Sequence, residues 1–322
     1  MKVRKYKTFN VVSITLLLFV ALLVYVTSQP AMAQLPSAFD DYTIQVIAPP
    51  KGTTEIWYTG VNEAGLVVMQ YFTPEVVGQA HTAILEDGIW TNIDVPGSVW
   101  CGLPSPSASG RVGLTYVDED WIEHAAIYHR GTYQYLPDHP DYLYRINCIG
   151  DHGLMCGSAY DPDDPTWRNH GVLLNTSLSV FKIFDYPGSG QTGACGINNA
   201  GLVVGYCADE TWTTMHGFLY DGENFTDIKV PGAEDSTGAY SINNSGEIGG
   251  WYVDSEGNWR GFILRKGEFK DFTIPISFSS FTYGVDFIND RGQLSGEFAD
   301  WDGNWHGYIA TPVRGGTRAG KK

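Results

Sequence analysis

The sequence has few basic residues, few cysteines and only one long hydrophobic run. Its 322 residues contain 20 Lys and Arg against 36 Asp and Glu, which gives a formal net charge of −16. A surface with this excess of negative charge repels the phosphates of nucleic acid and anionic lipid headgroups. Nucleic-acid binding is therefore excluded, and the acidic balance alone is typical of a surface that keeps a protein in solution.

Cysteine is scarce, with five residues and no Cys-x-x-Cys pair, so neither a redox dithiol nor a zinc knuckle is encoded. A chain of this length can bury a large core without cross-links. Cys148 and Cys156 flank one predicted hairpin turn, and Cys195 and Cys207 flank the next. Two local disulfides are therefore a hypothesis, with Cys101 left over.

The single hydrophobic run, Val11 to Val26, follows four basic residues and precedes Ala31-Met32-Ala33. This order predicts a secretory signal peptide over residues 1–33. An uncleaved membrane anchor is the alternative, although sixteen residues are short for a span. Either way we expect the folded part to be secreted or extracytoplasmic, with no stable membrane insertion if the signal is cleaved.

A short phrase recurs six times at intervals of 43 to 48 residues. It begins with a turn that ends in glycine, at Gly65, Gly110, Gly153, Gly201, Gly246 and Gly292. An aromatic residue follows five to seven residues later, at Phe72, Tyr116, Tyr160, Tyr206, Tyr252 and Phe298. A basic residue comes next, at His81, His124, His170, His216, Arg260 and His306. Self-similarity at this period indicates a repeat architecture.

The fifth unit shows what one repeat encodes. Residues 238–242 and 247–253 are predicted strands joined by the turn Asn243-Asn244-Ser245-Gly246, where Asn and Gly are expected because both tolerate positive φ. Further strands are predicted over 260–264 and 269–274, after a polar loop and a tight turn. Each unit thus holds four short antiparallel strands.

Six such units predict an all-β fold, a six-bladed β-propeller with four-stranded blades, as one domain over residues 34–313. A long β-sandwich is the alternative. The first strand of a blade lines the crowded axis, where small side chains fit best. The predicted first strands supply them, at Gly193, Ala194, Gly196, Gly238, Ala239 and Gly284.

The sixth unit lacks a fourth strand. The missing strand is expected at the start of the chain, because residues 41–46 match residues 271–274 and both are followed by proline. The N-terminal strand should therefore complete the last blade and remove an open sheet edge. The basic tail, residues 314–322, is expected to be disordered.

The turn Asn-Asn-x-Gly, the phrase His-Gly-Phe and the blade end Gly-x-Phe-x-Asp together resemble the HAF repeat, named for His-Ala-Phe. Units four and five carry the resemblance best, with residues 197–201 and 216–218, and 242–246 and 260–262. Unit five has Arg260 where the others have His. HAF repeats occur in bacterial proteins regarded as extracellular, so the resemblance implies export and a repeat β fold, with no established activity.

The six basic repeat positions invite a metal interpretation, which the predicted geometry opposes. They lie on the third strand of each blade, roughly 10 Å farther from the axis than the first, so neighbouring blades cannot share an ion. His and Arg both offer a planar N–H donor, and we expect a repeated structural hydrogen bond to a neighbouring strand or loop.

The loops between second and third strands combine carboxylates with tryptophan. Carboxylates beside exposed aromatic rings form a surface suited to sugars or calcium. The alternative is that the acidic turns only solvate the rim and each Trp packs on its own blade. The candidate residues are Asp118, Asp120, Trp121, Asp161, Asp163, Trp167, Asp209, Trp212, Asp254, Asp300, Asp302 and Trp305.

These observations favour a secreted, non-catalytic propeller that binds an extracellular protein or glycan through this loop face, with calcium as the one cofactor to consider. An extracellular polysaccharide hydrolase or lyase, with two carboxylates at the mouth of the central channel, is one alternative. A purely structural surface protein is another. An enzyme should show polar residues unique to one blade, whereas a binding surface should repeat around the ring.

Overall fold

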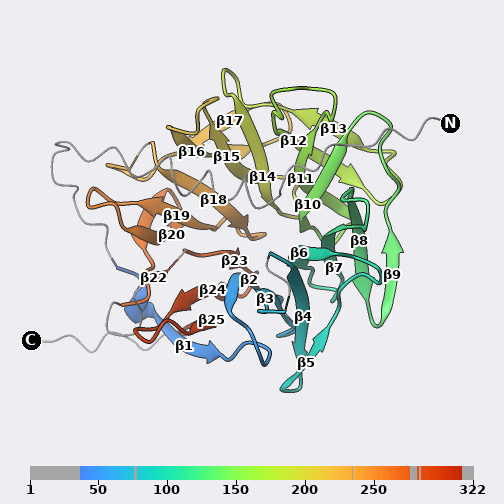
Figure 1. Cartoon of the computed structure of the whole chain (residues 1–322). Helices are drawn as coiled ribbons and strands as arrows, with labels where there is room; N and C mark the ends of the chain where they lie inside the picture. The colour runs from blue at the N-terminus through green and yellow to red at the C-terminus, as the bar shows by residue number, and fades with distance from the viewer. Residues whose placement is uncertain (1–36, 76–77, 234, 276–280, 283, 314–322) are drawn as a thin grey trace, which may run out of the picture.

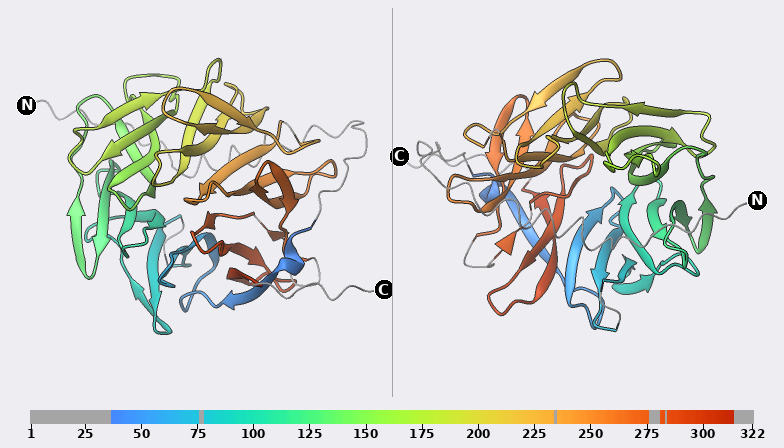
Figure 2. Two further views of the ribbon diagram at one scale, coloured as in Figure 1. Left: turned by 180° about the vertical axis from the view of Figure 1, so that it is seen from behind. Right: turned by 45° about the horizontal axis from the view of Figure 1, so that its top comes forward.

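The described part of the chain consists almost entirely of β-strands. A computed structural model describes residues 37–75, 78–233, 235–275, 281–282 and 284–313, and the predicted signal peptide (1–33) and basic tail (314–322) lie outside them. Six antiparallel sheets stand around a common axis, as Figure 1 and both views of Figure 2 show. The predicted six-bladed β-propeller is confirmed.

Five blades share one topology, in which each strand pairs with the next along the chain. The first contains β2 (Glu55–Val61), β3 (Val67–Phe72), β4 (Ala80–Glu86) and β5 (Ile89–Asn92). The second contains β6 (Trp100–Pro106), β7 (Val112–Val117), β8 (Glu123–His129) and β9 (Thr132–Tyr135). The third contains β10 (Leu143–Ile149), β11 (Leu154–Tyr160), β12 (His170–Asn175) and β13 (Phe181–Phe184).

The remaining two blades of this kind follow the same order. The fourth contains β14 (Gln191–Ile197), β15 (Val203–Ala208), β16 (Met215–Tyr220) and β17 (Phe225–Ile228). The fifth contains β18 (Thr237–Ile242), β19 (Ile248–Val253), β20 (Trp259–Arg265) and β21 (Glu268–Asp271). Each first strand lies nearest the axis.

The sixth blade is assembled from both ends of the described chain. Its inner strand is split into β22 (Phe281–Thr282) and β23 (Phe287–Ile288), which both pair with β24 (Leu294–Ala299). The next strand is β25 (Trp305–Pro312), and β1 (Tyr42–Ile47), after a short 3-10 helix (Phe39–Asp41), pairs with it in antiparallel register. Figure 1 shows blue β1 beside red β25. Closure of the last blade by the N-terminal strand is confirmed.

Apolar layers fill the gaps between neighbouring blades. At the closing junction, Ile309 of the sixth blade packs in one cluster with Ile56 and Met69 of the first. Equivalent clusters span the other junctions. A blade buries both of its faces only when it has a neighbour on each side, so ring closure completes the core.

Glycine in the inner strands makes room for side chains from the second strands. A Cβ added at Gly193 would lie 2.6 Å from the ring of Tyr206, and one at Gly238 would lie 2.6 Å from Trp251. These large rings therefore lie across the inner strand toward the axis. Small residues were predicted in the inner strands because the axis is crowded, and the specific reason at Gly193 and Gly238 is the ring of a second-strand residue.

The turns between first and second strands hold neighbouring blades together. Four begin with Asn, whose Oδ1 accepts N–H groups two and four residues ahead. Each Asn Nδ2 donates to a backbone carbonyl in the turn of the next blade, over 2.9 to 3.3 Å. The four residues are Asn62, Asn198, Asn243 and Asn289.

This arrangement corrects the sequence-based account of the turns. In them only the glycines have positive φ, and no Asn among the described residues does. Asn is used because one side chain can accept from its own turn and donate to the next blade. The Asn-Asn-x-Gly phrase is thus an inter-blade clasp.

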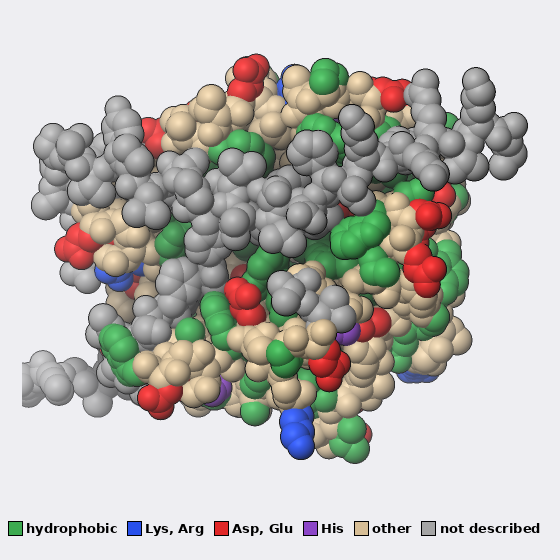
Figure 3. Space-filling model, viewed as in Figure 1, with side chains coloured by type: hydrophobic (Ala, Val, Ile, Leu, Met, Phe, Trp, Pro, Cys, Tyr) green, Lys and Arg blue, Asp and Glu red, His purple; other side chains and the backbone are tan. Residues whose placement is uncertain are grey.

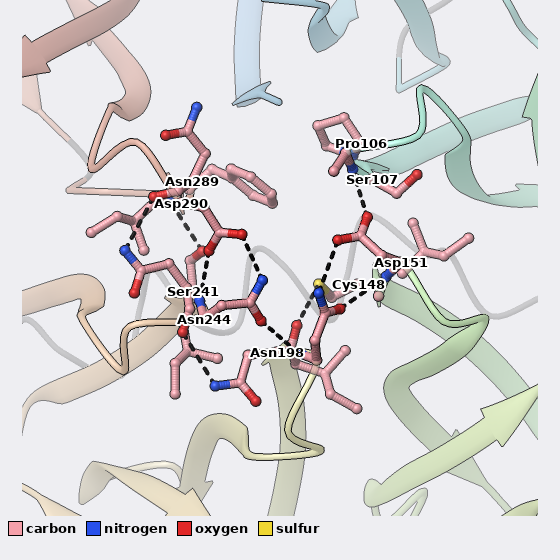
Figure 4. A pocket seen from close by; sticks show the side chains of 18 of the residues that line it. Pro106, Ser107, Cys148, Asp151, Asn198, Ser241, Asn244, Asn289 and Asp290 are labelled. Carbon is pink, nitrogen blue, oxygen red and sulfur yellow. Dashed lines mark hydrogen bonds between the residues drawn. The ribbon is translucent and has the colours of Figure 1, made fainter. Parts of the chain in front are cut away.

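A second circle of hydrogen bonds runs through the following turn residue. Backbone N–H groups of Asp151, Asn199, Asn244 and Asp290 each donate to the side chain at the same position of the next blade, over 2.7 to 3.3 Å. Ala108 N–H donates to Asp151, and the circle stops there because alanine offers no acceptor. Figure 4 shows these hydrogen bonds around a pocket with about 430 Å³ of empty space, including its part open to solvent.

The cysteines do not form the disulfides hypothesised from the sequence. All five are free. Cys148 and Cys156 are direct cross-strand partners. Cys195 instead occupies a bulge of its strand, while Cys207 pairs with Thr192.

Ring closure gives a stability prediction. A chain that lacks residues 40–50 loses β1, which exposes the edge of β25 and part of the apolar layer at the closing junction. We expect the whole ring to lose cooperative unfolding or to melt more than about 10 °C lower. Calorimetry of this variant and of a chain beginning at residue 34 measures the effect, and equal melting temperatures would contradict the closure account.

The Asn clasp gives a second prediction. Asn198→Ala removes two turn hydrogen bonds and one bond to the next blade, at a buried position. We expect a loss of about 2–4 kcal/mol in the free energy of unfolding, measured by urea denaturation. Asn224→Ala, in an exposed turn at the outer edge, is the matched control and should change it by less than about 0.5 kcal/mol. Equal effects at both positions would refute the clasp.

Candidate ligand-binding face

The two ends of the ring differ in how their polar groups are used. At the end of the ring that carries the Asn clasps, the backbone amides of the turns donate hydrogen bonds to side chains of the neighbouring turns. The other end carries the loops between second and third strands, on which the sequence places its candidate residues. On the face shown in Figure 3, Asp and Glu lie scattered among hydrophobic side chains, with few Lys or Arg.

The first Asp of these loops is committed to its own turn. Asp118 Oδ1 accepts the backbone N–H of Asp120 and of Ile122, both at 2.9 Å. Asp300 Oδ1 does the same with two amides of its loop, and its hydrogen bonds to His306 and to the turn lower its pKa. Asp161, Asp209 and Asp254 also accept amides of their own loops. These carboxylates shape the turns.

The six basic repeat positions each lie within 4.0 Å of a carboxylate. His124 bridges two, with Nδ1 at 2.8 Å from Asp138 and Nε2 at 3.1 Å from Asp118. Such contacts tie a loop to the blade that carries it. The other positions are His81 with Asp94, His170 with Asp185, His216 with Asp227, Arg260 with Asp254 and His306 with Asp300.

Three of the six aromatic residues in the sequence phrase lie directly across from these basic positions. They are Tyr116, Tyr252 and Phe298. Phe72, Tyr160 and Tyr206 lie one residue away from that position. Successive strand residues face opposite sides of a sheet, so this second group points away from the basic position.

Three tryptophans occupy left-handed backbone positions in their loops. Trp121, Trp167 and Trp212 have φ of 62°, 52° and 59°. Gly257 and Gly303 hold the corresponding positions in the fifth and sixth blades, with φ of 83° and 81°. Each backbone N–H bonds to the carbonyl three residues earlier, on Asp118, Asp164, Asp209, Asp254 and Asp300.

A left-handed non-glycine residue costs roughly 1–2 kcal/mol, so glycine is the residue that the turn itself favours. Two of the three side chains are also open to solvent, with 54% of Trp121 and 44% of Trp167 exposed. Strained backbone that presents an exposed indole indicates a use for the indole.

The remaining candidate tryptophans are placed differently. Trp305 packs against the apolar layer of the closing junction. Trp212 lines a small pocket between the fourth and fifth blades with Trp251 and Trp259. Trp301, which sequence reasoning passed over, is 61% exposed. Its position next to Asp300, one of the repeated loop aspartates, could have identified Trp301 as a candidate from the sequence.

A charged network stands between the second and third blades. Arg145 Nε lies 2.9 and 2.8 Å from the two carboxylate oxygens of Glu123, and its Nη2 contacts the same group. The Tyr160 hydroxyl donates to Glu123 Oε2 at 2.9 Å. The ring of Trp167 lies 5.6 Å from that of Tyr160. The sequence phrase included Tyr160, but no spacing linked Glu123 with Arg145.

A pair of buried carboxyl groups lies between the sixth and first blades. Asp286 and Glu297, 3% and 2% exposed, contact each other, and Asp286 Oδ2 accepts the N–H of Thr59 at 3.2 Å. Burial raises the pKa of Asp286 to about 6, and burial with the neighbouring Asp286 raises that of Glu297 further above normal. These carboxyls are unique to one blade, yet they meet each other rather than flank an open space, which does not suit glycoside hydrolysis.

Neither a metal cluster nor a membrane helix occurs in the described ranges. No three His, Cys, Asp or Glu side chains gather there as a metal site, so the acidic loops offer calcium no such cluster. Across the same ranges, no helix has the length and apolar character needed to cross a bilayer.

Comparisons with known proteins identify the fold alone. No family profile and no curated protein sequence matches the chain. A streptogramin B lyase structure is similar, with 13% identity, TM-score 0.50, and 85% of this chain and 100% of that one covered. The Pyrococcus horikoshii acylaminoacyl peptidase also has 13% identity and TM-score 0.50, over 83% and 47%. The fucose-specific lectin from Aleuria aurantia has 12% identity and TM-score 0.49, over 88% and 100%. The protein is thus a six-bladed β-propeller whose neighbours assign it no ligand.

The buried carboxyls give a pH prediction. The folded protein holds their protons more tightly than the unfolded chain does, so stability should fall as the pH rises from about 4 through about 6. Glu297→Gln keeps a hydrogen-bonding group that does not titrate, so its melting temperature should decline less than that of the wild type between about pH 4.5 and 7.5. Calorimetry at both values tests this. Parallel declines would show that the pair does not titrate in this range.

Proposed function

We propose that this protein is a secreted, non-catalytic β-propeller that binds carbohydrate through the loop face. The observation that carries the proposal is the set of tryptophans held in left-handed turns, where the equivalent loops of other blades use glycine. A flat indole stacks on the apolar face of a sugar ring while its edge stays in water.

The distribution of the tryptophans supports a binding surface spread over several blades. Trp121 and Trp167 lie on neighbouring blades, and exposed Trp301 lies on the sixth. A weak site on each of several blades gives useful avidity toward a repetitive ligand. Glycans are repetitive, which favours them over a small soluble ligand.

Export completes the proposal. The predicted signal peptide and the resemblance to the HAF repeat both support a location outside the cytoplasm, where glycans are displayed. The net charge of −16 favours neutral over strongly anionic glycans.

The strained turns give a prediction that separates binding from stability. Trp121→Gly with Trp167→Gly should remove sugar binding while stability stays equal or rises, because glycine relieves the left-handed strain. Ligand-observed NMR with a panel of neutral methyl glycosides measures binding, and urea unfolding measures stability.

Lys266→Gly is the matched control, since Lys266 also has positive φ (51°) but lies in the turn between β20 and β21. It should bind sugar like the wild type. Equal sugar signals from the wild type and the double Trp variant would refute the proposed site. A wild type that binds no glycoside or polysaccharide would favour a purely structural protein instead.

A further inference from the structure

We infer that Arg145, Glu123 and Tyr160 form a subsite for the hydroxyl groups of a neutral sugar, between the second and third blades. This inference rests on the proposed function and names the part of the face that would select the ligand. It is carried by the hydrogen-bond geometry, by the exposure of Arg145 and by the departure of these residues from the repeat.

The network connects the two loops with exposed tryptophans. Glu123 begins β8, two residues after Trp121, and Tyr160 ends β11, directly before the loop that carries Trp167. Arg145 reaches Glu123 from β10, the inner strand of the third blade. A sugar stacked on Trp167, whose ring lies 5.6 Å from that of Tyr160, would therefore lie beside the charged pair.

Arg145 is the accessible member of the pair. Its side chain is 30% exposed, against 7% for Glu123. Nε and Nη2 are committed to Glu123, while Nη1 makes no hydrogen bond to a described residue. The guanidinium carbon lies 6.0 Å from the centre of the Tyr160 ring, so the N–H donors of Arg145 lie next to an aromatic ring.

These residues depart from the repeat at two positions. Arg145 pairs with Ser158 of the second strand. In three other blades the equivalent position of the first strand is a glycine, namely Gly102, Gly193 and Gly238. Where Glu123 begins the third strand, other blades have Ala80, Met215, Trp259 and Trp305. A buried ion pair adds little net stability compared with apolar residues of similar volume. The fold therefore does not require the pair.

The charge balance selects the ligand class. Burial opposes the charge of Arg145, but the neighbouring Glu123 outweighs burial and raises the arginine pKa, so the guanidinium stays charged. Glu123 neutralises the positive charge, which leaves no net attraction for a carboxylate. Donors, acceptors and aromatic rings remain, which is the combination that binds a neutral polyol.

The test uses Glu123→Met with Arg145→Met, which replaces the pair by apolar side chains. Methyl glycosides of glucose, galactose, mannose, fucose and N-acetylglucosamine, together with glucuronate, serve as probes in saturation-transfer NMR. We expect the double variant to melt close to the wild type and to lose at least about 10-fold in affinity for the preferred neutral glycoside. Arg145→Lys should lose affinity as well, because lysine lacks the planar fork.

Glu247→Met with Arg265→Met is the control, since that ion pair of 2.7 Å has an arginine with the same 30% exposure and joins the turn between β18 and β19 to the end of β20. It should keep full affinity even where stability drops. Unchanged affinity in the Glu123/Arg145 variant, alongside lost binding in the double Trp variant, would overturn the subsite and leave the proposed function standing. Preference for glucuronate would overturn the neutral class. No binding of any probe by the wild type would overturn both.

Discussion

The antiparallel pairing of β1 with β25 is the constraint on which the rest of the molecule depends. It joins residues 260 to 270 positions apart, so it forms only when all the intervening blades are in place. The apolar layer between Ile309 and the first blade then becomes buried. Closure also sets the two ends of the ring, because every loop of one kind must emerge on the same side.

Residues that recur from blade to blade and residues found in only one blade have different roles in this protein. The repeated Asn clasps, loop aspartates and basic positions bond to one another and hold blades and loops in place. The unrepeated residues, above all Arg145 with Glu123, stand where other blades carry glycine or an apolar side chain. The sequence analysis expected a binding surface to repeat around the ring, whereas the proposed subsite lies at one junction only, where the repeat is broken.

The sequence allowed the blade number, the strand order and the closing strand to be predicted, because these follow from local period and turn chemistry. It did not reveal that Asn198 donates to the next blade, since that bond joins turns 45 positions apart. It also did not show that Asp118 and Asp300 accept amides of their own loops, because that bonding depends on the loop conformation. The alternation of Trp121 with Gly257 at one loop position was visible, but its meaning required the backbone angles.

The central claim is that sugar binds at the tryptophans held in left-handed turns. The indole N–H resonances of the ten tryptophans report on this directly when a neutral methyl glycoside is titrated into labelled protein. We expect the signals of Trp121 and Trp167 to shift, while that of Trp90, whose Nε1 donates to the carbonyl of Ala48, stays fixed. Movement of Trp90 with the other two unmoved would place the ligand elsewhere and contradict the account.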